Sequence, residues 1–141
     1  MNVQMNTIPH DQQRYDTAGD WWLDRNTDTL IINISFLGDW KMEACLGIHE
    51  FIEAIRCMAD RVDQELVDQW DLSFKGKGEP GDDPAAPYHK QHVQALIVER
   101  TLARQLGVDW NQYEQKIKEL VYHVHETKTE RQAAPHPGNG Q

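Results

Sequence analysis

Three polar residues in the run His49-Glu50-Phe51-Ile52-Glu53 have the types and spacing of a metal-binding helix. Residues four apart share one helix face, so His49 and Glu53 can bind the same ion. Glu50 lies beside that face, where a carboxylate can take a proton from a metal-bound water. The pattern is that of the HExxH zinc helix with Glu53 in place of the second histidine. The alternative is a helix with ordinary polar pairs on its solvent-facing side.

A second predicted helix carries a histidine and a glutamate within its apolar stripe. On a helical wheel, His92 and Glu99 fall in the middle of the apolar side rather than at its edge. A buried carboxylate without a partner costs several kcal/mol or becomes protonated, so Glu99 needs a cation, a charged histidine or a metal ion. The expected metal ligands on the two facing helices are His49, Glu53, His92 and Glu99, and the secondary candidates near the rim are His89 and Tyr88.

The mixture of imidazole and carboxylate donors determines which ions such a cluster would bind. Nitrogen and oxygen ligands together suit a single zinc ion, with manganese or iron as alternatives. Magnesium is a further alternative, although it prefers oxygen ligands. Four protein ligands would close the site and make the ion structural. Without a metal, the same residues would form a buried network of His–Glu hydrogen bonds that ties the two helices together.

The segments before the first helix predict a β-hairpin. Residues 29–36 are rich in β-branched side chains, and apolar residues alternate with more polar ones, which is typical of a half-buried strand. Residues 21–23 form the partner strand across a polar turn. The side chains expected to face the core are Leu30, Ile32, Ile34 and Phe36.

Periodicity and capping residues predict three helices, at about 40–62, 88–106 and 110–126. Asp39 and Asp109 are the expected N-caps of the first and third helices. Residues 65–70 are a candidate for a further short helix between the first and second. The fold class is therefore α+β, mostly α, with an N-terminal β-hairpin followed by three helices.

Composition divides the chain into one domain and two tails. Residues 1–19 are polar and without period, which predicts a flexible arm. Residues 20–126 form a single metal-binding domain. Residues 73–87 are dense in Gly and Pro, which predicts a loop. Residues 127–141 are polar and rich in Pro and Gly at their end, which predicts a disordered tail.

The overall charge and the cysteines exclude several classes of protein. The 141 residues include 14 Lys and Arg against 23 Asp and Glu, and the net charge of −9 argues against binding a nucleic-acid backbone. The sequence contains no run of 18 apolar residues, so no membrane span is expected, and the N-terminus lacks the pattern of a signal peptide. The two cysteines, Cys45 and Cys57, form no disulfide framework, which favours a reducing cytoplasm.

The sequence resembles the zincin class of metallohydrolases, in a small gluzincin-like form. The resemblance rests on the strand at 30–36, the helix with His49-Glu50-x-x-Glu53 and a second helix with His92 and Glu99. The runs GDWKMEACLGIHEFIEAI and APYHKQHVQALIVERTLARQLGVDW also look like small uncharacterised proteins of tailed phages and prophages. The zincin resemblance implies a zincin-like fold, His49 as a zinc ligand and Glu50 as the general base.

That resemblance also implies a peptide or protein substrate and a hydrolase that acts through a metal-activated water. A phage origin implies the cytoplasm of the host cell or the virion as the location. Glu53 departs from the zincin pattern, since a carboxylate in place of the second histidine weakens the Lewis acidity of the ion. His92 is the expected third ligand, and Glu99 the fourth ligand or a partner of a ligand.

Two other functions fit the sequence. An all-α, magnesium-dependent nucleotide pyrophosphohydrolase would use carboxylates on paired helices. Glu50-x-x-Glu53 supplies half of such a motif, but the matching Glu79 and Asp82 lie in the predicted loop. The second possibility is a non-enzymatic virion or regulatory component that keeps the helix pair for packing and uses its acidic surface to bind a partner.

Overall fold

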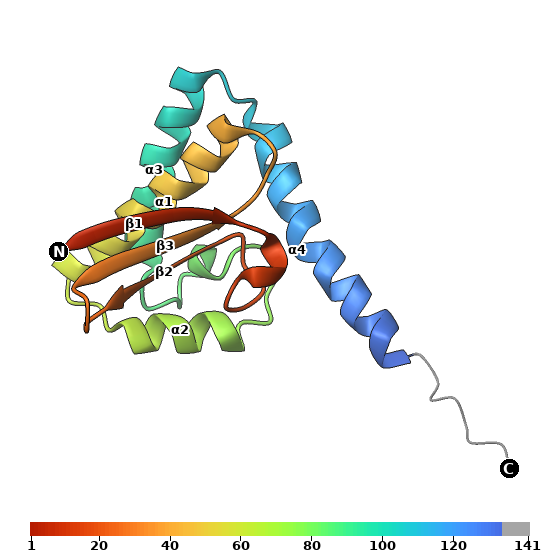
Figure 1. Ribbon diagram of the computed structural model, residues 1–141, viewed down its shortest axis with the longest axis horizontal. Coiled ribbons are helices and arrows are strands. Elements are labelled where there is room, and N and C mark those ends of the chain that lie inside the picture. The colour runs from red at the N-terminus through yellow and green to blue at the C-terminus, as the bar shows by residue number, and fades with distance from the viewer. Residues whose placement is uncertain (134–141) are drawn as a thin grey trace, which may run out of the picture.

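The computed structural model describes the backbone of residues 1–133 and the side chains of residues 1–121. It confirms an α+β, mostly helical fold in which one face of a small sheet packs against helices (Figure 1). The strands are β1 (Asn2–Ile8), β2 (Gly19–Asp24) and β3 (Thr29–Ser35). The helices are α1 (Trp40–Ala59), α2 (Gln64–Ser73), α3 (His89–Leu106) and α4 (Trp110–Ala133), with short 3-10 turns at His10–Gln12 and at Pro80–Asp82.

The predicted hairpin is present as β2 and β3, which pair antiparallel with Trp21 opposite Ile32. Alternation buries Leu30, Ile32 and Ile34 against the helices, as predicted. Phe36 is 61% exposed instead, because the strand ends at Ser35 and the chain turns away before Gly38.

The prediction of a flexible arm at residues 1–19 was wrong for its first half. Residues 2–8 form β1, which pairs in parallel with β3 and makes β3 the central strand of the order β1-β3-β2. Met5 contacts α1 at Gly47, where a Cβ atom would lie 2.6 Å from the Met5 sulfur. The glycine therefore lets α1 approach the sheet closely, and β1 is part of the fold.

Capping side chains set the helix ends largely as predicted. Asp39 accepts a hydrogen bond from the Lys41 N–H at the start of α1. Gly107 ends α3 in the left-handed conformation, with φ of +70°. Asp109 accepts from the Gln112 N–H at the start of α4. The first helix ends at Ala59, three residues before the predicted end.

The further short helix predicted at residues 65–70 is present as α2, which runs from residue 64 to 73 beside the sheet (Figure 1), so the described residues form four α-helices. The last helix is also longer than predicted. It continues to Ala133 through the first part of the predicted tail at 127–141, and the rest of that tail lies outside the described residues. In Figure 1, α4 leaves the body of the fold and points away from it.

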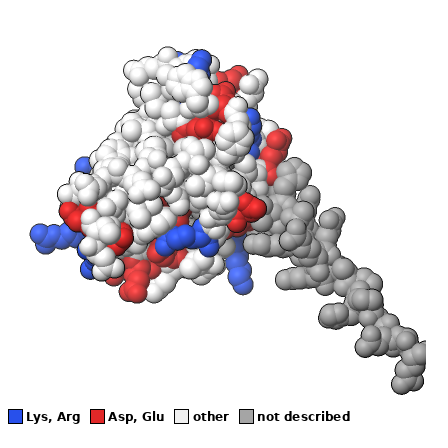
Figure 2. All heavy atoms as spheres, in the orientation of Figure 1, with Lys and Arg blue, Asp and Glu red and all other residues white. Residues whose placement is uncertain are grey.

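Charged side chains are distributed in small groups over the surface. Figure 2 shows Asp and Glu interspersed with Lys and Arg, and no continuous basic area among the described residues on the face in view. Within the described part of the chain, no helix has the length and apolar character that crossing a bilayer requires.

Candidate metal centre

Three side chains from two helices converge where α1 packs along α3. His49 Nε2 lies 3.4 Å from Glu53 Oε2 and 3.2 Å from His92 Nδ1, and His92 Nδ1 lies 3.0 Å from Glu53 Oε2. The three side chains are buried, with 4%, 6% and 3% of each residue exposed. We call these residues, His49, Glu53 and His92, the metal-ligand cluster.

The spacing and chemistry of this cluster fit a divalent transition metal. Tetrahedral zinc with bonds of 2.0–2.2 Å keeps its ligand atoms about 3.3–3.6 Å apart. The three observed distances, 3.0, 3.2 and 3.4 Å, lie at or just below that range. Two imidazole nitrogens and one carboxylate oxygen also form a donor set that zinc accepts. These residues could therefore hold a metal ion.

Each member of the cluster is held by a second residue at the atom that faces away from the other two. Trp21 Nε1 donates to Glu53 Oε1 over 3.0 Å. His92 Nε2 lies 3.0 Å from Asp82 Oδ1. Such outer partners fix the orientation and tautomer of metal ligands in proteins.

Glu99 plays that outer role for His49. Its Oε2 lies 2.7 Å from His49 Nδ1, the ring nitrogen that points away from Glu53 and His92. The other carboxylate oxygen accepts a hydrogen bond of 2.5 Å from the Tyr113 hydroxyl. The structure therefore brings Glu99 into contact with His49 and leaves it outside the three converging ligand atoms.

Glu50 lies next to the metal-ligand cluster but points toward the first residue of β2. A Cβ atom on Gly19 would overlap Glu50 Oε1, so only glycine leaves room for this carboxylate. Burial raises the pKa of Glu50 well above its usual range, and the charge of Glu53 raises it further. The residue as a whole is only partly buried.

The carboxylates reverse the effect of burial on the two imidazoles. Burial alone would lower the pKa of His49, but hydrogen bonds to Glu53 and Glu99 raise it well above its usual value. The pKa of His92 is likewise raised, because its hydrogen bond to Glu53 outweighs burial. The two imidazoles hold the pKa of Glu53 at about 2 despite its burial. A metal ion bound by these atoms must displace protons, so its affinity rises with pH.

The turn before α3 adds two exposed carboxylates on the outer side of His92. Glu79 Oε2 lies 3.5 Å from His92 Nε2, beside Asp82, and the three residues form a second group that could hold a cation. Gly81 packs on the imidazole, since a Cβ there would lie 2.5 Å from the ring. Among the described residues, no Lys or Arg forms an ion pair with these carboxylates or with Glu50, Glu53 or Glu99.

The two secondary candidates lie beside the cluster and face other partners. His89 Nδ1 contacts the Gly81 carbonyl at 2.9 Å and holds the turn in place. Tyr88 packs the edge of its ring near His92, with centroids 6.3 Å apart, and its hydroxyl donates to Asp71.

Tyr88 belongs to a second polar group, which is only partly buried. Arg14 binds Asp20 through two hydrogen bonds, of 2.6 and 2.8 Å. Asp71 accepts one hydrogen bond from Tyr15 and one from Tyr88. Arg14 also lies 3.3 Å from Asp68. We call this group the arginine cluster; its members are Arg14, Tyr15, Asp20, Asp68, Asp71 and Tyr88.

Three residues around the cluster were not predicted as site residues: Trp21, Asp82 and Tyr113. Trp21 was predicted only as part of a strand, and Asp82 was considered only as a loop carboxylate. Tyr113 offered the clearest signal, because it places a hydroxyl in the apolar stripe of its helix. A buried hydroxyl needs a hydrogen-bond partner, which here is Glu99.

Neither a family model nor a curated protein nor a solved structure matches the chain.

Proposed function

We propose that this protein is a metal-dependent hydrolase in which His49, Glu53 and His92 hold a single zinc ion. One observation carries the proposal: the three ligand atoms converge at 3.0–3.4 Å while a separate residue holds the outer atom of each ligand. Manganese or iron is the alternative ion. The resemblance of the first helix to zincins supports the same interpretation.

A bound zinc ion would supply Lewis-acid polarisation and lower the pKa of a coordinated water. The chain itself would supply the general base. Glu50 adjoins His49, is partly exposed and has a raised pKa, so it suits taking a proton from the attacking water and passing it to the leaving group. The proposed substrate is a carbonyl compound, most simply a peptide.

The two cysteines agree with a cytoplasmic location, which we include in the proposal. Both Cys45 and Cys57 are free and fully buried in the core. A reducing compartment keeps such thiols unpaired.

Metal analysis and one pair of variants test the proposal. Protein purified without a histidine tag should contain about one zinc per chain, as for a mononuclear site. Glu50→Gln should keep the zinc and lower hydrolysis of a quenched fluorescent peptide library about 100-fold or more. His49→Ala should lose both zinc and activity.

Three outcomes would contradict the proposal. If the wild-type protein contains no transition metal, the cluster is a buried network of hydrogen bonds and not a metal site. Magnesium-dependent turnover of nucleoside triphosphates would favour the pyrophosphohydrolase. A Glu50→Gln variant that retains full activity would remove the general base.

A further inference from the structure

Tyr113 is a fully buried residue of α4 that reaches the surroundings of the metal-ligand cluster. It is 1% exposed, and its hydroxyl donates to Glu99 Oε1. The other oxygen of Glu99 lies 2.7 Å from His49 Nδ1. A continuous hydrogen-bonded path therefore runs from α4 through α3 to the ligand on α1.

The path determines which ring nitrogen of His49 carries the proton. A carboxylate at Glu99 accepts the Nδ1 hydrogen, which leaves Nε2 free to bind a metal. Tyr113 donates to the remaining oxygen of Glu99. With both of its oxygens engaged, the carboxylate has a fixed rotation, and the plane of the His49 ring is fixed with it.

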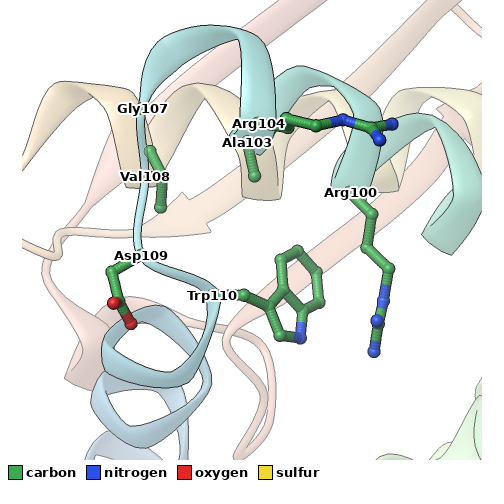
Figure 3. Close-up of a pocket in the computed structure, with 7 residues that line it drawn as sticks. All are labelled: Arg100, Ala103, Arg104, Gly107, Val108, Asp109 and Trp110. Atoms are coloured by element: carbon green, nitrogen blue, oxygen red, sulfur yellow. The ribbon is translucent and has the colours of Figure 1, made fainter.

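Helix α4 contacts the body through a stripe that contains Tyr113. Among the side chains of α4 that the structure describes, Tyr113 is fully buried, and Trp110, Ile117 and Leu120 are partly buried against the core. The Trp110 ring meets the Tyr113 ring edge-on at 5.3 Å. Figure 3 shows Trp110 beside Arg100 in an open pocket below the turn from α3 to α4, and the Arg100 guanidinium lies 4.6 Å from the Trp110 ring.

We propose that Tyr113 is a positioning residue that orients His49 through Glu99 and thereby couples the docking of α4 to metal binding. The inference rests on the proposed metal centre and extends it to a residue of α4. Because coupling between two equilibria is reciprocal, metal binding must strengthen α4 docking as much as docking strengthens metal binding.

Removing one hydroxyl should weaken zinc binding without removing a ligand. Tyr113→Phe keeps the ring and its packing but leaves Glu99 Oε1 without its donor. The loss of a residue that contacts a ligand directly lowers metal affinity by about 10- to 100-fold, and the lower end of that range applies to Tyr113, which acts one step further out through Glu99. We expect the zinc Kd, measured by competition with a chromophoric chelator, to rise about tenfold. The visible spectrum of the Co²⁺-loaded variant should change as His49 reorients.

Tyr15→Phe is the matched control. It also removes a phenol that donates to a carboxylate, here the partly buried Asp71, yet Asp71 contacts no member of the metal-ligand cluster. Its zinc Kd and Co²⁺ spectrum should match those of the wild type. An equal loss of zinc affinity in both variants would show that the effect comes from general loosening of the core and would overturn the inference.

A double-mutant cycle tests whether Tyr113 acts through Glu99. In the Glu99→Gln background, Tyr113→Phe should change the zinc Kd by less than about twofold, because the path is already broken. The same tenfold loss in both backgrounds would assign the effect to packing and contradict the inference.

Hydrogen exchange tests the reciprocal effect on α4. Zinc should slow amide exchange around residues 113–117 in the wild type, and this protection should be absent in Tyr113→Phe. Wild-type protein that binds no zinc would refute the metal centre itself. Wild-type protein that binds zinc while Tyr113→Phe binds it equally well would refute only the role of Tyr113.

Discussion

The molecule contains two neighbouring groups of polar side chains, one buried and one partly exposed, that satisfy their charges in different ways. In the arginine cluster, the guanidinium of Arg14 faces Asp20, whose side chain is 2% exposed. Burial raises the pKa of Asp20, while Arg14 opposes that rise by hydrogen bonding to it. The Arg14–Asp20 pair is complete within the chain, since this buried anion has a fixed cation beside it.

The metal-ligand cluster has no such cation among the described residues. Glu53 and Glu99 meet only imidazoles, a tryptophan and a tyrosine, and Glu50 lies close by. Protons on the imidazoles can compensate the charge only below their raised pKa values. A divalent ion would compensate the charge of the metal-ligand cluster over a wider pH range, whereas the buried Asp20 of the arginine cluster already has Arg14 beside it.

The largest effect should come from withdrawing the metal. If zinc is present at a thousand times its Kd, it should stabilise the wild type by about 4 kcal/mol, and excess EDTA should remove that increment. His92→Ala should show no increment. Denaturant unfolding with and without zinc measures it. Variants of the arginine cluster should keep the full stabilisation by zinc. If variants of both clusters lose that stabilisation, the two clusters do not differ in this respect.

Breaking the arginine cluster should have a slightly smaller effect that zinc does not change. Arg14→Met keeps the aliphatic stem but leaves Asp20 buried without its cation, which should cost about 3 kcal/mol. The double variant with Asp20→Asn should recover part of that loss, because no buried charge remains. Arg25→Met is the control, since Arg25 is an exposed arginine and its replacement should change stability by less than about 0.5 kcal/mol.

The local periodicity of the sequence was sufficient to predict that the metal-ligand residues lie close together. His49 and Glu53 are one turn apart on α1, and His92 lies in the apolar stripe of α3, so their faces follow from spacing alone. The buried face of β3 follows from alternation in the same way. These features depend on residues close together in the sequence, and local patterns therefore predict them.

Features that depend on distant partners were not predictable in the same way. In β1, Val3 and Met5 alternate with polar residues over too short a stretch to indicate a strand, and the pairing with β3 is a long-range parallel contact. The placement of Glu99 on the outer nitrogen of His49 depends on how α1 and α3 rotate against each other. Helix periodicity predicts that two residues face the core but not which atoms meet.

The smallest effect concerns Asp71, which connects the two clusters through Tyr88. Burial raises the pKa of Asp71 to about 6 in the folded protein, although Tyr88 and Tyr15 both donate to it. A carboxyl with a raised folded-state pKa favours folding below about pH 4 and loses that contribution as the pH rises through about 6. Between about pH 4 and 7 the wild type should therefore lose about 2 kcal/mol relative to Asp71→Asn, which does not titrate.

Denaturant unfolding in EDTA at several pH values measures this difference without a contribution from metal. The comparison with the variant is needed because other carboxyls titrate over the same range in both proteins. Asp68→Asn is the control, since Asp68 lies in the same cluster and its replacement should shift stability without reproducing this pH profile. A constant difference between wild type and Asp71→Asn across that pH range would show that the buried phenols already stabilise the Asp71 anion, and that the arginine cluster is compensated without a second titrating group.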